Sequence, residues 1–521
     1  MRALILIALS LPALAQGQTP PAAPLVTVGA PVLKMLRFDW QPVPGATHYV
    51  LQIKPNASSS YQAYGNPILA PRALAGLTIP VHALDWVNAR YKVAACNAAG
   101  CTDSSELSVQ DLMLTSIGYL KASNPDADDR FGITVALSQD GNTLVTSAWE
   151  DSNARGVNGD QTDNSATDTG AVYVFRRIGV GWRQEAYLKS DGFGLYFGQA
   201  ISVSSDGSVV AVGSPGEQDR RTPLAGSVYL FTRAANGTWS QTQKVPPRAP
   251  QLFYYFGTSV DLSDDASVLA VTSLNPDDPE GPTDVTTHIF RRSDTGWEFE
   301  LTLPKDECQD SMSQMAGIGT LIVDLCSSDS GSLLRSHRHI GADWIRMQDV
   351  PLSSGTFRTA VSGNSARAAV SIRDFAGGAD RVQVFARVGN QWVVEQYIDP
   401  PRGATFLAFN RNGTMLAIGD PTSSSGGAGV SDTAQPETSP PPSNQDGAVY
   451  VYQRGESGWT LLKVVKAPNP ANGDFFGNAV ALSGNGLTLA VGAPREDSAA
   501  RGIDGNQADN SKEAAGAVYL Y

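Results

Sequence analysis

The sequence has few basic residues for its length of 521: 38 Lys and Arg stand against 51 Asp and Glu, a formal net charge of −13. This balance argues against nucleic acid as a partner, because phosphate backbones require a basic face. The same sign disfavours anionic membrane surfaces. Beyond the N-terminus no segment approaches the length of apolar sequence that spans a bilayer, so we expect no membrane insertion.

The sequence also lacks the short motifs of common enzyme classes. It has no HExxH, no G-x-S-x-G and no P-loop, and GFGLYFG (192–198) lacks dinucleotide-binding spacing. His337 and His339 share one face of a predicted strand and could hold a metal, but no third ligand can be named. We expect both histidines to be solvent-exposed strand residues. Carboxylates are plentiful, but nothing marks a catalytic pair, so we predict no enzymatic activity and no cofactor.

Cysteine is scarce, with four in the chain and no CxxC spacing. Cys96 and Cys101 flank NAAG, which is typical of a tight turn. Cys308 and Cys326 are symmetric about Gly317, so they would face each other across a hairpin. We predict both disulfides; the alternative is four free, buried thiols.

The N-terminus has the features of a secretory signal peptide over residues 1–15. Arg2 precedes a short apolar run, and Ala13-Leu14-Ala15 fits the small-residue cleavage pattern. Export to a periplasm, a cell surface or the medium follows from this prediction and agrees with disulfide formation. A Pro- and Ala-rich leader over residues 16–24 precedes the first domain.

Residues 25–109 alternate between short apolar strands and turns. LRFDWQPVPGATHYVLQI gives two strands around a Pro-Gly turn, and RYKVAACNAAGCTDSSELSV gives two more. With Trp40 early and Tyr91 opening a late strand, this segment resembles a fibronectin type III domain. The resemblance implies a β-sandwich used as a spacer or a binding module.

A repeated unit runs from residue 119 onward. YLKASNPDADDRFGITVALSQDGNTLVTSAWED recurs as YLKSDGFGLYFGQAISVSSDGSVVAVGSPGE, and its second part recurs as FFGNAVALSGNGLTLAVGAPRED. Clear units begin at Phe131-Gly132, Phe197-Gly198, Phe256-Gly257 and Phe476-Gly477. Their third strands read GAVYVF, GSVYLF, GAVYVY or GAVYLY. A tryptophan opens the fourth strand: Trp182, Trp239, Trp297, Trp344, Trp392 and Trp459. Four alternating strands per unit are typical of a propeller blade.

Seven such units fit into residues 110–521, although units 4 and 5 lack a clear Phe-Gly pair. The chain stops at Tyr521 on the third strand of the last unit. We predict that residues 110–120 supply the missing fourth strand, with Leu114 at the tryptophan position. This pairing would close the ring and remove an exposed edge strand.

These repeats resemble the FG-GAP repeats of the integrin α-subunit propeller and its bacterial relatives. The resemblance implies an all-β, seven-bladed β-propeller used for extracellular recognition and cell adhesion. The calcium loops of integrin blades are absent here, because turns such as SQDGN (138–142) and SGNGL (483–487) hold too few carboxylates to wrap the ion. The family's metal sites are therefore not carried over.

The long loops connect the second and third strands of three neighbouring units, at 150–169, 421–446 and 495–515. They emerge on the face that carries the connections between units, and binding usually resides in such loops. The Ser-, Gly- and Pro-rich loop 421–446 predicts disorder. The other two contain ARGVNGDQTDNS (154–165) and ARGIDGNQADNS (500–511), which should lie side by side where the ring closes.

Each repeated phrase offers four oxygen-rich residues as candidate ligand-binding positions. They are Asn158, Asp160, Asp163 and Asn164 in one copy, and Asp504, Asn506, Asp509 and Asn510 in the other. Three interpretations remain open: Asx-turns that fold each loop onto itself, a calcium site, or contact with another ligand. The spacing does not fit an EF-hand loop.

The sequence thus predicts a secreted or cell-surface, non-catalytic binding or adhesion protein whose loop face recognises an extracellular protein or glycan. One alternative is a propeller hydrolase or lyase acting on extracellular polysaccharide. Another is a structural envelope protein stiffened by calcium.

Overall fold

The computed structural model divides the chain into two compact units and is all-β, with 2% helix and 52% strand. Unit 1 is Met1–Pro31, Met35–Val81 and Asn88–Leu112; unit 2 is Val32–Lys34, His82–Val87 and Met113–Tyr521. The predicted signal peptide and Cys308 lie outside the described residues. Those described are 18–31, 33–56, 58–70, 75–80, 88–151, 155–165, 169–179, 181–218, 222–275, 284–303, 310–328, 331–352, 355–373, 380–400, 403, 405–434 and 445–521.

Unit 1 contains two antiparallel sheets, and whether they form a fibronectin type III domain stays a prediction. Alternate side chains point inward, so that the rings of Phe38 and Tyr91 lie 5.1 Å apart and those of Trp40 and Tyr49 lie 5.3 Å apart. The first sheet contains β1 (Val26–Gly29), β2 (Met35–Trp40) and β6 (Ala75–Pro80). The second contains β3 (His48–Lys54), β4 (Gln62–Ala63), β5 (Ile68–Leu69), β7 (Arg90–Asn97), β8 (Gly100–Asp103) and β9 (Leu107–Ser108).

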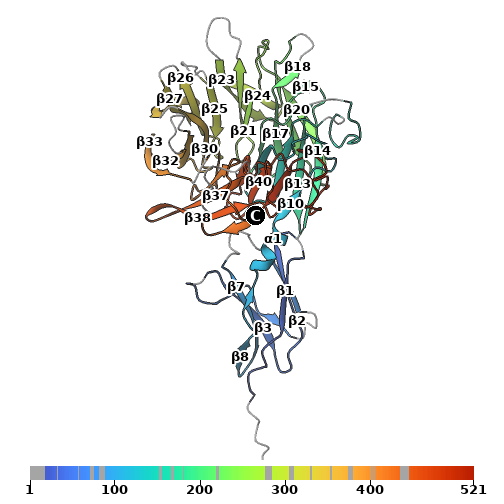
Figure 1. Ribbon diagram of the computed structural model, residues 1–521. Coiled ribbons are helices and arrows are strands. Elements are labelled where there is room, and N and C mark those ends of the chain that lie inside the picture. The colour runs from blue at the N-terminus through green and yellow to red at the C-terminus, as the bar shows by residue number, and fades with distance from the viewer. Residues whose placement is uncertain are drawn as a thin grey trace, which may run out of the picture. The chain divides into compact units, whose positions relative to one another are not determined.

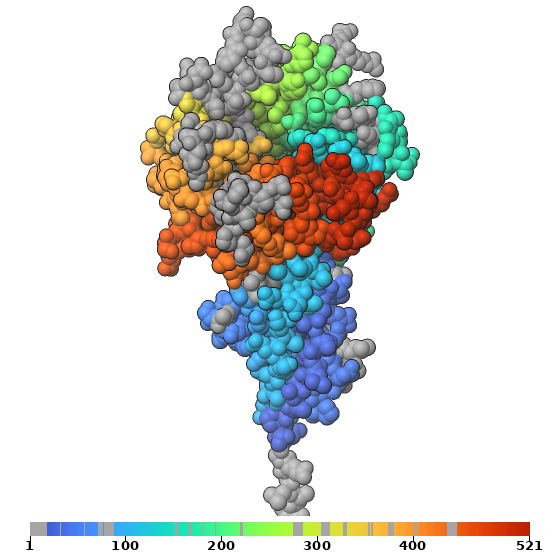
Figure 2. Space-filling model, viewed as in Figure 1, coloured from blue at the N-terminus to red at the C-terminus, as the bar shows by residue number. Residues whose placement is uncertain are grey.

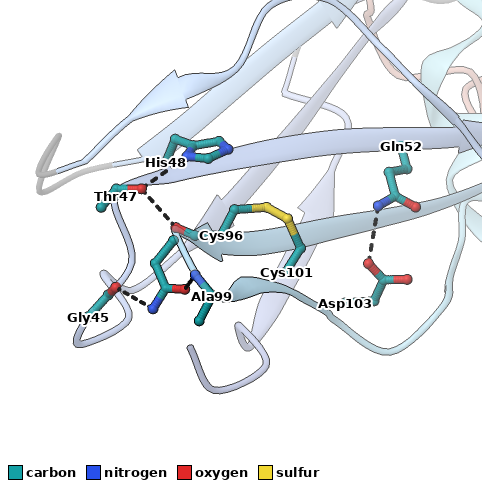
Figure 3. Close-up of a disulfide and its surroundings, with 9 residues drawn as sticks. Gly45, Thr47, His48, Gln52, Cys96, Ala99, Cys101 and Asp103 are labelled. Atoms are coloured by element: carbon teal, nitrogen blue, oxygen red, sulfur yellow. Dashed lines mark hydrogen bonds between the residues drawn. A yellow bond between two sulfur atoms is a disulfide. The ribbon is translucent and has the colours of Figure 1, made fainter. Parts of the chain in front are cut away.

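The predicted disulfide between Cys96 and Cys101 is confirmed (Figure 3). The two cysteines face each other across the hairpin of β7 and β8, with Cα atoms 4.0 Å apart. Thr47 at the start of β3 donates its hydroxyl to the Cys96 carbonyl. Cys326 is also disulfide-bonded, while its predicted partner Cys308 is one of the residues not described.

Unit 2 contains seven antiparallel sheets of four or more strands within the described ranges. Sheet 1 is β11 (Thr134–Leu137), β12 (Thr143–Ala148), β13 (Ala171–Ile178) and β14 (Gly181–Leu188). Sheet 2 is β16 (Ile201–Val203), β17 (Val209–Ser214), β19 (Ser227–Arg233) and β20 (Trp239–Val245). Sheet 3 is β21 (Ser259–Leu262), β22 (Val268–Asn275), β23 (Asp284–Ser293) and β24 (Gly296–Thr302). Sheet 4 is β25 (Asp310–Met315), β26 (Leu321–Ser328), β27 (Gly331–Ile340), β28 (Asp343–Arg346) and β29 (Val350–Leu352).

The remaining sheets follow the same plan. Sheet 5 is β30 (Thr356–Val361), β31 (Arg367–Ile372), β32 (Arg381–Val388) and β33 (Gln391–Ile398). Sheet 6 is β34 (Phe406–Phe409), β35 (Met415–Asp420), β36 (Gly429–Ser431), β37 (Ala448–Gly455) and β38 (Gly458–Lys466). Sheet 7 is β39 (Ala479–Leu482), β40 (Leu489–Ala493), β41 (Ala517–Leu520) and β10 (Gly118–Leu120). A further two-stranded sheet pairs β15 (Phe193–Leu195) with β18 (Gly216–Gln218).

The first strands of these sheets contact one another in a closed cycle, in the order β11, β16, β21, β25, β30, β34, β39 and back to β11. The hairpin turns that follow these strands form a second cycle. Each turn donates one backbone N–H to the turn of the next sheet, over 2.6 to 3.3 Å. The bonds run Gln139 to Ser205, Ser205 to Asp264, Asp264 to Gly317, Ile318 to Gly363, Asn364 to Arg411, Arg411 to Gly484, and Gly484 to Gln139.

The repeated Phe-Gly pair joins each clear unit to the sheet before it. Phe131 donates its amide to the Ala515 carbonyl of sheet 7 and packs edge-on against Tyr173, with ring centres 5.2 Å apart. Gly132 has φ +90°, and a Cβ there would lie 2.3 Å from the Ala517 carbonyl oxygen. Glycine is therefore needed where the chain passes the neighbouring sheet.

The ring closes in sheet 7 through β10, which pairs with β41 in register Gly118↔Leu520 to Leu120↔Val518 (Figure 1). In Figure 2 the turquoise residues of the first repeat lie against the red residues of the last. The predicted strand over 110–120 is wrong for its first part. Gln110–Leu112 form a 3₁₀ turn and Met113–Ser116 form α1, so Leu114 does not occupy a tryptophan position.

Lys34 contacts the residue that follows β41. Its ammonium donates to the main-chain oxygen of Tyr521 at 2.8 Å, to Thr488 Oγ1 at 2.8 Å and to the Leu487 carbonyl at 3.0 Å. The neighbouring Leu33 packs into the hydrophobic cluster that holds Leu120. Lys34 is buried, so these three oxygens replace its hydration shell.

The tryptophan that opens a fourth strand contacts the preceding sheet. The indole Nε1 of Trp239 donates to Glu185 at 3.1 Å, and that of Trp459 donates to Glu395 at 3.1 Å. Burial alone would raise the pKa of Glu395, but hydrogen bonds from Arg367, Arg454 and Trp459 lower it to about 2. These residues join sheet 1 to sheet 2 and sheet 5 to sheet 6.

Two further expectations are wrong. His337 is buried, and its Nδ1 lies 3.3 Å from Asp324 Oδ2, whose other oxygen accepts from Ser313. His339 is half-buried and its Nε2 lies 2.8 Å from Arg291 Nη2, so neither histidine is the solvent-exposed strand residue that was expected. The predicted disorder of loop 421–446 is wrong for residues 421–434, where β36 pairs with β38, while residues 435–444 lie outside the described residues.

Candidate functional site: the paired loops of sheets 1 and 7

The two copies of the repeated phrase attach to their sheets in the same way. Asn158 and Asp504 occupy equivalent places, with φ of 53° and 54°. The amide of Asn158 donates to the Tyr187 carbonyl at 2.7 Å, and that of Asp504 donates to the Tyr119 carbonyl at 2.7 Å. Their side-chain Oδ1 atoms accept the amides of the same tyrosines. These two predicted ligand residues therefore fasten each loop to a fourth strand.

In the first copy, Asp160 and Asp163 form Asx-turns. Asp160 Oδ1 accepts the Thr162 amide at 2.9 Å and hydroxyl at 2.7 Å, and these bonds lower the pKa of the carboxyl. Asp163 Oδ1 accepts the Ser165 amide at 3.0 Å. Both carboxylates point back to the backbone of their own loop, as the loop-closure interpretation predicts.

The second copy forms the same two Asx-turns, with Asn506 in the place of Asp160. Asn506 Oδ1 accepts the Ala508 amide at 3.0 Å, where the first copy has Asp160. Asp509 Oδ1 accepts the Ser511 amide at 3.1 Å, and its Oδ2 accepts the Ala499 amide at 3.0 Å. The bond from Ser511 lowers the pKa of Asp509. Asn510 is exposed.

Asp126 joins the two loops. It lies on the connection between β10 and β11, and its Oδ2 accepts Asn164 Nδ2 of the first loop at 2.9 Å. Its Oδ1 accepts the Lys512 ammonium of the second loop at 2.8 Å. The two copies lie side by side, as the sequence predicted. One carboxylate thus links the first and the last sheet of unit 2 at their shared loop face.

Behind the first loop lies a buried polar cluster that sequence reasoning missed. Asp151 accepts the Lys189 ammonium at 2.9 Å and the hydroxyls of Tyr187 at 2.8 Å and Tyr173 at 2.9 Å. The Asn124 amide donates to the same carboxylate at 2.9 Å. All five side chains are buried, so the cluster is a compact, hydrogen-bonded ion pair beneath the loop.

The second loop covers an equivalent cluster. Glu496 accepts the Lys121 ammonium at 2.7 Å and the Tyr119 hydroxyl at 2.8 Å. Tyr519 donates to Asn469 Oδ1 at 3.0 Å, and in the first cluster the Tyr173 hydroxyl oxygen lies 2.8 Å from the equivalent Asn124 Oδ1. Burial lowers the pKa of Lys121, whereas Glu496 raises it.

Each cluster also has a second buried carboxyl. Asp129 Oδ2 accepts the Asp126 amide at 2.6 Å, and Asp474 Oδ2 accepts the Ala471 amide at 3.1 Å. Burial, followed by repulsion from Asp151, raises the pKa of Asp129 to about 7. Burial also raises the pKa of Asp474 to about 7. Both groups lie two residues before a phenylalanine of the Phe-Gly pairs.

A signal for these clusters was present in the sequence. Tyr-Leu-Lys occurs at 119–121 and at 187–189, and Asn-Pro occurs at 124–125 and at 469–470. An acidic residue follows the second strand in both repeats. The carboxylates and ammonium groups bond to each other beneath the loops, so this arrangement braces the loops. Across the described ranges, no group of three or more His, Cys, Asp or Glu side chains could hold a metal ion.

A model of the FG-GAP repeat matches residues 115–175 and 459–521, the two segments that contain the paired loops. The chain carries FG-GAP repeats. No curated protein matches its sequence.

Solved structures to which the chain is similar are β-propeller proteins. A periplasmic gluconolactonase of Pseudomonas aeruginosa has 14% identity and a TM-score of 0.42, over 82% of this chain and 98% of that chain. A protein of Lactobacillus plantarum has 14% identity and a TM-score of 0.43, over 81% and 98%. Sqt1 of Chaetomium thermophilum has 13% identity and a TM-score of 0.42, over 73% and 82%. With TM-scores below 0.5, none of these likenesses bears on what this chain binds or catalyses.

Proposed function

We propose that the protein is an exported, non-catalytic binding protein, and that the paired loops recognise an extracellular protein or glycan. In this proposal the seven sheets of unit 2 are the blades of one FG-GAP propeller. Unit 1 is a fibronectin type III-like spacer. The paired loops are defined as residues 155–165 and 496–512.

The bridge through Asp126 carries the proposal. Two long loops with little regular structure are each closed by internal hydrogen bonds, joined by one carboxylate and braced from below by a buried ion pair. Such bracing lowers the conformational entropy lost on binding, which is how rigid loops gain affinity. Exposed polar groups, among them Thr162 and Asn510, remain at the surface for a partner.

Export is supported by the disulfide in unit 1, because disulfides persist in oxidising compartments. No helix in the described part of the chain is long and apolar enough to cross a membrane. Absence of catalysis is proposed because the buried acids of both clusters are committed to neighbouring lysine, tyrosine or backbone groups.

The test is a binding screen of the mature protein against a glycan array and a panel of extracellular proteins, followed by two variants. Thr162→Arg with Asn510→Arg adds bulk to both loops and keeps Asn158 and Asp504, which fasten the loops to their sheets; it removes one loop-closing bond, from the Thr162 hydroxyl to Asp160. Asn412→Arg is the matched control, because it changes an exposed turn residue that follows a first strand. We expect the double variant to lose the partner and the control to keep it; equal retention would place the site elsewhere.

A further inference from the structure

At two contacts between neighbouring sheets of unit 2, a glutamate binds an arginine of the next sheet. Glu185 of sheet 1, three residues after the tryptophan, accepts Arg233 Nε of sheet 2 at 2.7 Å. Glu395 of sheet 5 stands at the same place and accepts Arg454 Nε of sheet 6 at 2.6 Å. The repeat thus provides a carboxylate for an arginine of the following sheet.

At the contact between sheets 4 and 5 this glutamate is replaced by Met347, three residues after Trp344. Met347 packs against the hydrophobic cluster that holds Phe385. Arg387 of sheet 5 pairs with Trp392 across β32 and β33, which is the place of the arginines that glutamates bind elsewhere. Sheet 4 therefore gives Arg387 no carboxylate at this position.

Arg338 of sheet 4 brings a second positive charge to the same point. One turn of sheet 5 holds both guanidinium groups, because Arg338 Nη1 donates to Asn390 Oδ1 at 2.7 Å and Arg387 Nη1 donates to the Gly389 carbonyl at 3.1 Å. Arg387 Nε donates to the Ser365 carbonyl at 2.6 Å. Within the described ranges neither arginine forms an ion pair, and both keep N–H groups that make no hydrogen bond.

Exposed apolar side chains share this surface with the two arginines. Ile345 pairs with Arg338 across β27 and β28 and is 48% exposed. Val394 and Tyr397 are 42% and 49% exposed. Both lie on the same side of sheet 5 as Arg387, because their cross-strand partners alternate with Arg387 along β32. We call these five residues the arginine patch.

The patch adjoins a strand edge that is covered in other sheets. In sheets 1, 6 and 7 a segment of the chain pairs with the outer edge of the fourth strand at one equivalent place: Val157 with Leu188, Val430 with Val465, and Ile503 with Leu120. Ile398 occupies that place in sheet 5, where β33 pairs only with β32 among the described residues. An unpaired strand edge is a template for an added strand.

We infer that β33 accepts an extended segment of a partner protein as an added strand, with an aspartate or glutamate of that segment on Arg338 and Arg387. Guanidinium groups bind carboxylates through paired N–H donors, so the charge of the patch selects an acidic segment. Apolar residues of the segment would cover Ile345, Val394 and Tyr397, in the β-strand addition by which sheet edges bind peptides. The surface is separate from the paired loops, so its failure would leave the proposed loop function untouched.

A partner protein fits this patch better than a second copy of the chain. A two-fold axis through the patch would bring the arginines of both copies together, and like charges repel. The eight residues of β33 set the length of segment that can pair along the whole edge.

Phage display of random peptides of about 12 residues against the immobilised full-length protein tests the inference. We expect the enriched sequences to contain Asp or Glu next to Val, Ile, Leu or Phe. Each enriched peptide is then synthesised beside a neutral copy in which Asn and Gln replace every Asp and Glu. In fluorescence anisotropy the acidic peptide should bind at least about tenfold more tightly than its neutral copy. This comparison needs only the wild-type protein.

Variants then locate the site. Arg338→Gln with Arg387→Gln should weaken the acidic peptide at least about tenfold. Arg176→Gln is the matched control, because Arg176 holds the register of Arg338 in sheet 1, and it should change affinity by less than about twofold. Val394→Asp changes an exposed residue and keeps both arginines, so it should weaken binding at least about tenfold even where the double variant does not fold.

The inference is overturned if no acidic sequence is enriched, if the neutral copies bind equally well, or if the folded variants bind like wild type. Sedimentation velocity and competition by heparin examine the other occupants. A wild-type dimer that Arg387→Gln dissociates would assign the patch to a second copy, and heparin that displaces every peptide would assign it to a sulfated glycan. Either result would also overturn the inference.

Discussion

The ammonium of Lys512 lies 2.8 Å from the carboxylate of Asp126, although the two residues are 386 positions apart in the chain. This contact occurs where the last repeat meets the first, and the second oxygen of the same carboxylate holds the loop of sheet 1. The contacts through which the first and last repeats of unit 2 meet therefore also hold the paired loops together.

Replacing Asp126 by Ala should separate the two loops without unfolding the protein. The ion pair is partly exposed, and such pairs contribute less than about 1 kcal/mol to global stability. We expect faster amide hydrogen exchange in residues 158–164 and 504–512, with a nearly unchanged melting temperature. Asp39→Ala removes an exposed ion pair of unit 1 and serves as the control. Unchanged exchange in both loops would show that Asp126 does not couple them.

Breaking the buried ion pair beneath the first loop should lower the unfolding free energy much more than Asp126→Ala does. Lys189→Met leaves the Asp151 carboxylate buried without its cation, and such losses cost about 3–5 kcal/mol. The equivalent Lys121→Met should have a similar effect through Glu496. Chemical denaturation measures both. A loss below about 1 kcal/mol for either variant would contradict the bracing role of that cluster.

Stability should fall as pH rises from about 4 to about 7. The pKa of Asp129 is about 7 in the folded protein, above its ordinary value, so the folded state holds this proton after the unfolded chain has lost it. Groups facing Asp129 are Asp126, Asp151 and Lys189. The three-unit difference corresponds to up to about 4 kcal/mol.

Asp129→Asn replaces the titrating carboxyl by a neutral amide and so tests that pH dependence. The variant should gain stability relative to wild type between pH 5 and pH 8, and Asp474→Asn should do the same. Denaturation at the two pH values measures the gain, with the exposed Asp294→Asn as the reference. A gain that is equal at pH 5 and pH 8 would contradict the raised pKa values.

The contribution of the contact between sheets 5 and 6 to stability should be lost as pH falls, which is the opposite pH dependence. Hydrogen bonds hold the pKa of Glu395 at about 2, so its contribution is present above about pH 4.5 and disappears as pH falls through about 2. Glu395→Gln should lower the unfolding free energy at pH 7 by about 1–3 kcal/mol, because Arg367 and Arg454 would then donate to a neutral amide oxygen instead of a carboxylate. Equal stability of variant and wild type at pH 7 would contradict this.

Local pattern predicted the sheets, but long-range contacts decided the details. Alternation, Gly-rich turns and the repeated Phe-Gly and Trp positions are local signals, and the sheets follow them. Lys34 could not be predicted, because its partners lie more than 450 positions away. Leu114 was misplaced because the prediction copied a full-length fourth strand, whereas Gln110–Leu112 form a 3₁₀ turn and Met113–Ser116 form α1.

For the candidate loops too, local sequence predicted the position but not the contacts of each side chain. Their positions were predictable from repetition and from the order of the strands. The direction of each carboxylate was not, because an Asx-turn and a ligand site use the same residue types. Asp160, Asp163 and Asp509 all accept amides of their own loops. Ligand contact by the eight predicted residues stays a prediction.

The most direct test of the central claim is a hydrogen-exchange footprint of the protein with and without the partner found in the binding screen. We predict protection concentrated in residues 155–165 and 496–512. Protection concentrated instead in the turns 139–142 and 205–208, on the opposite side of the sheets, would contradict a recognition role for the paired loops.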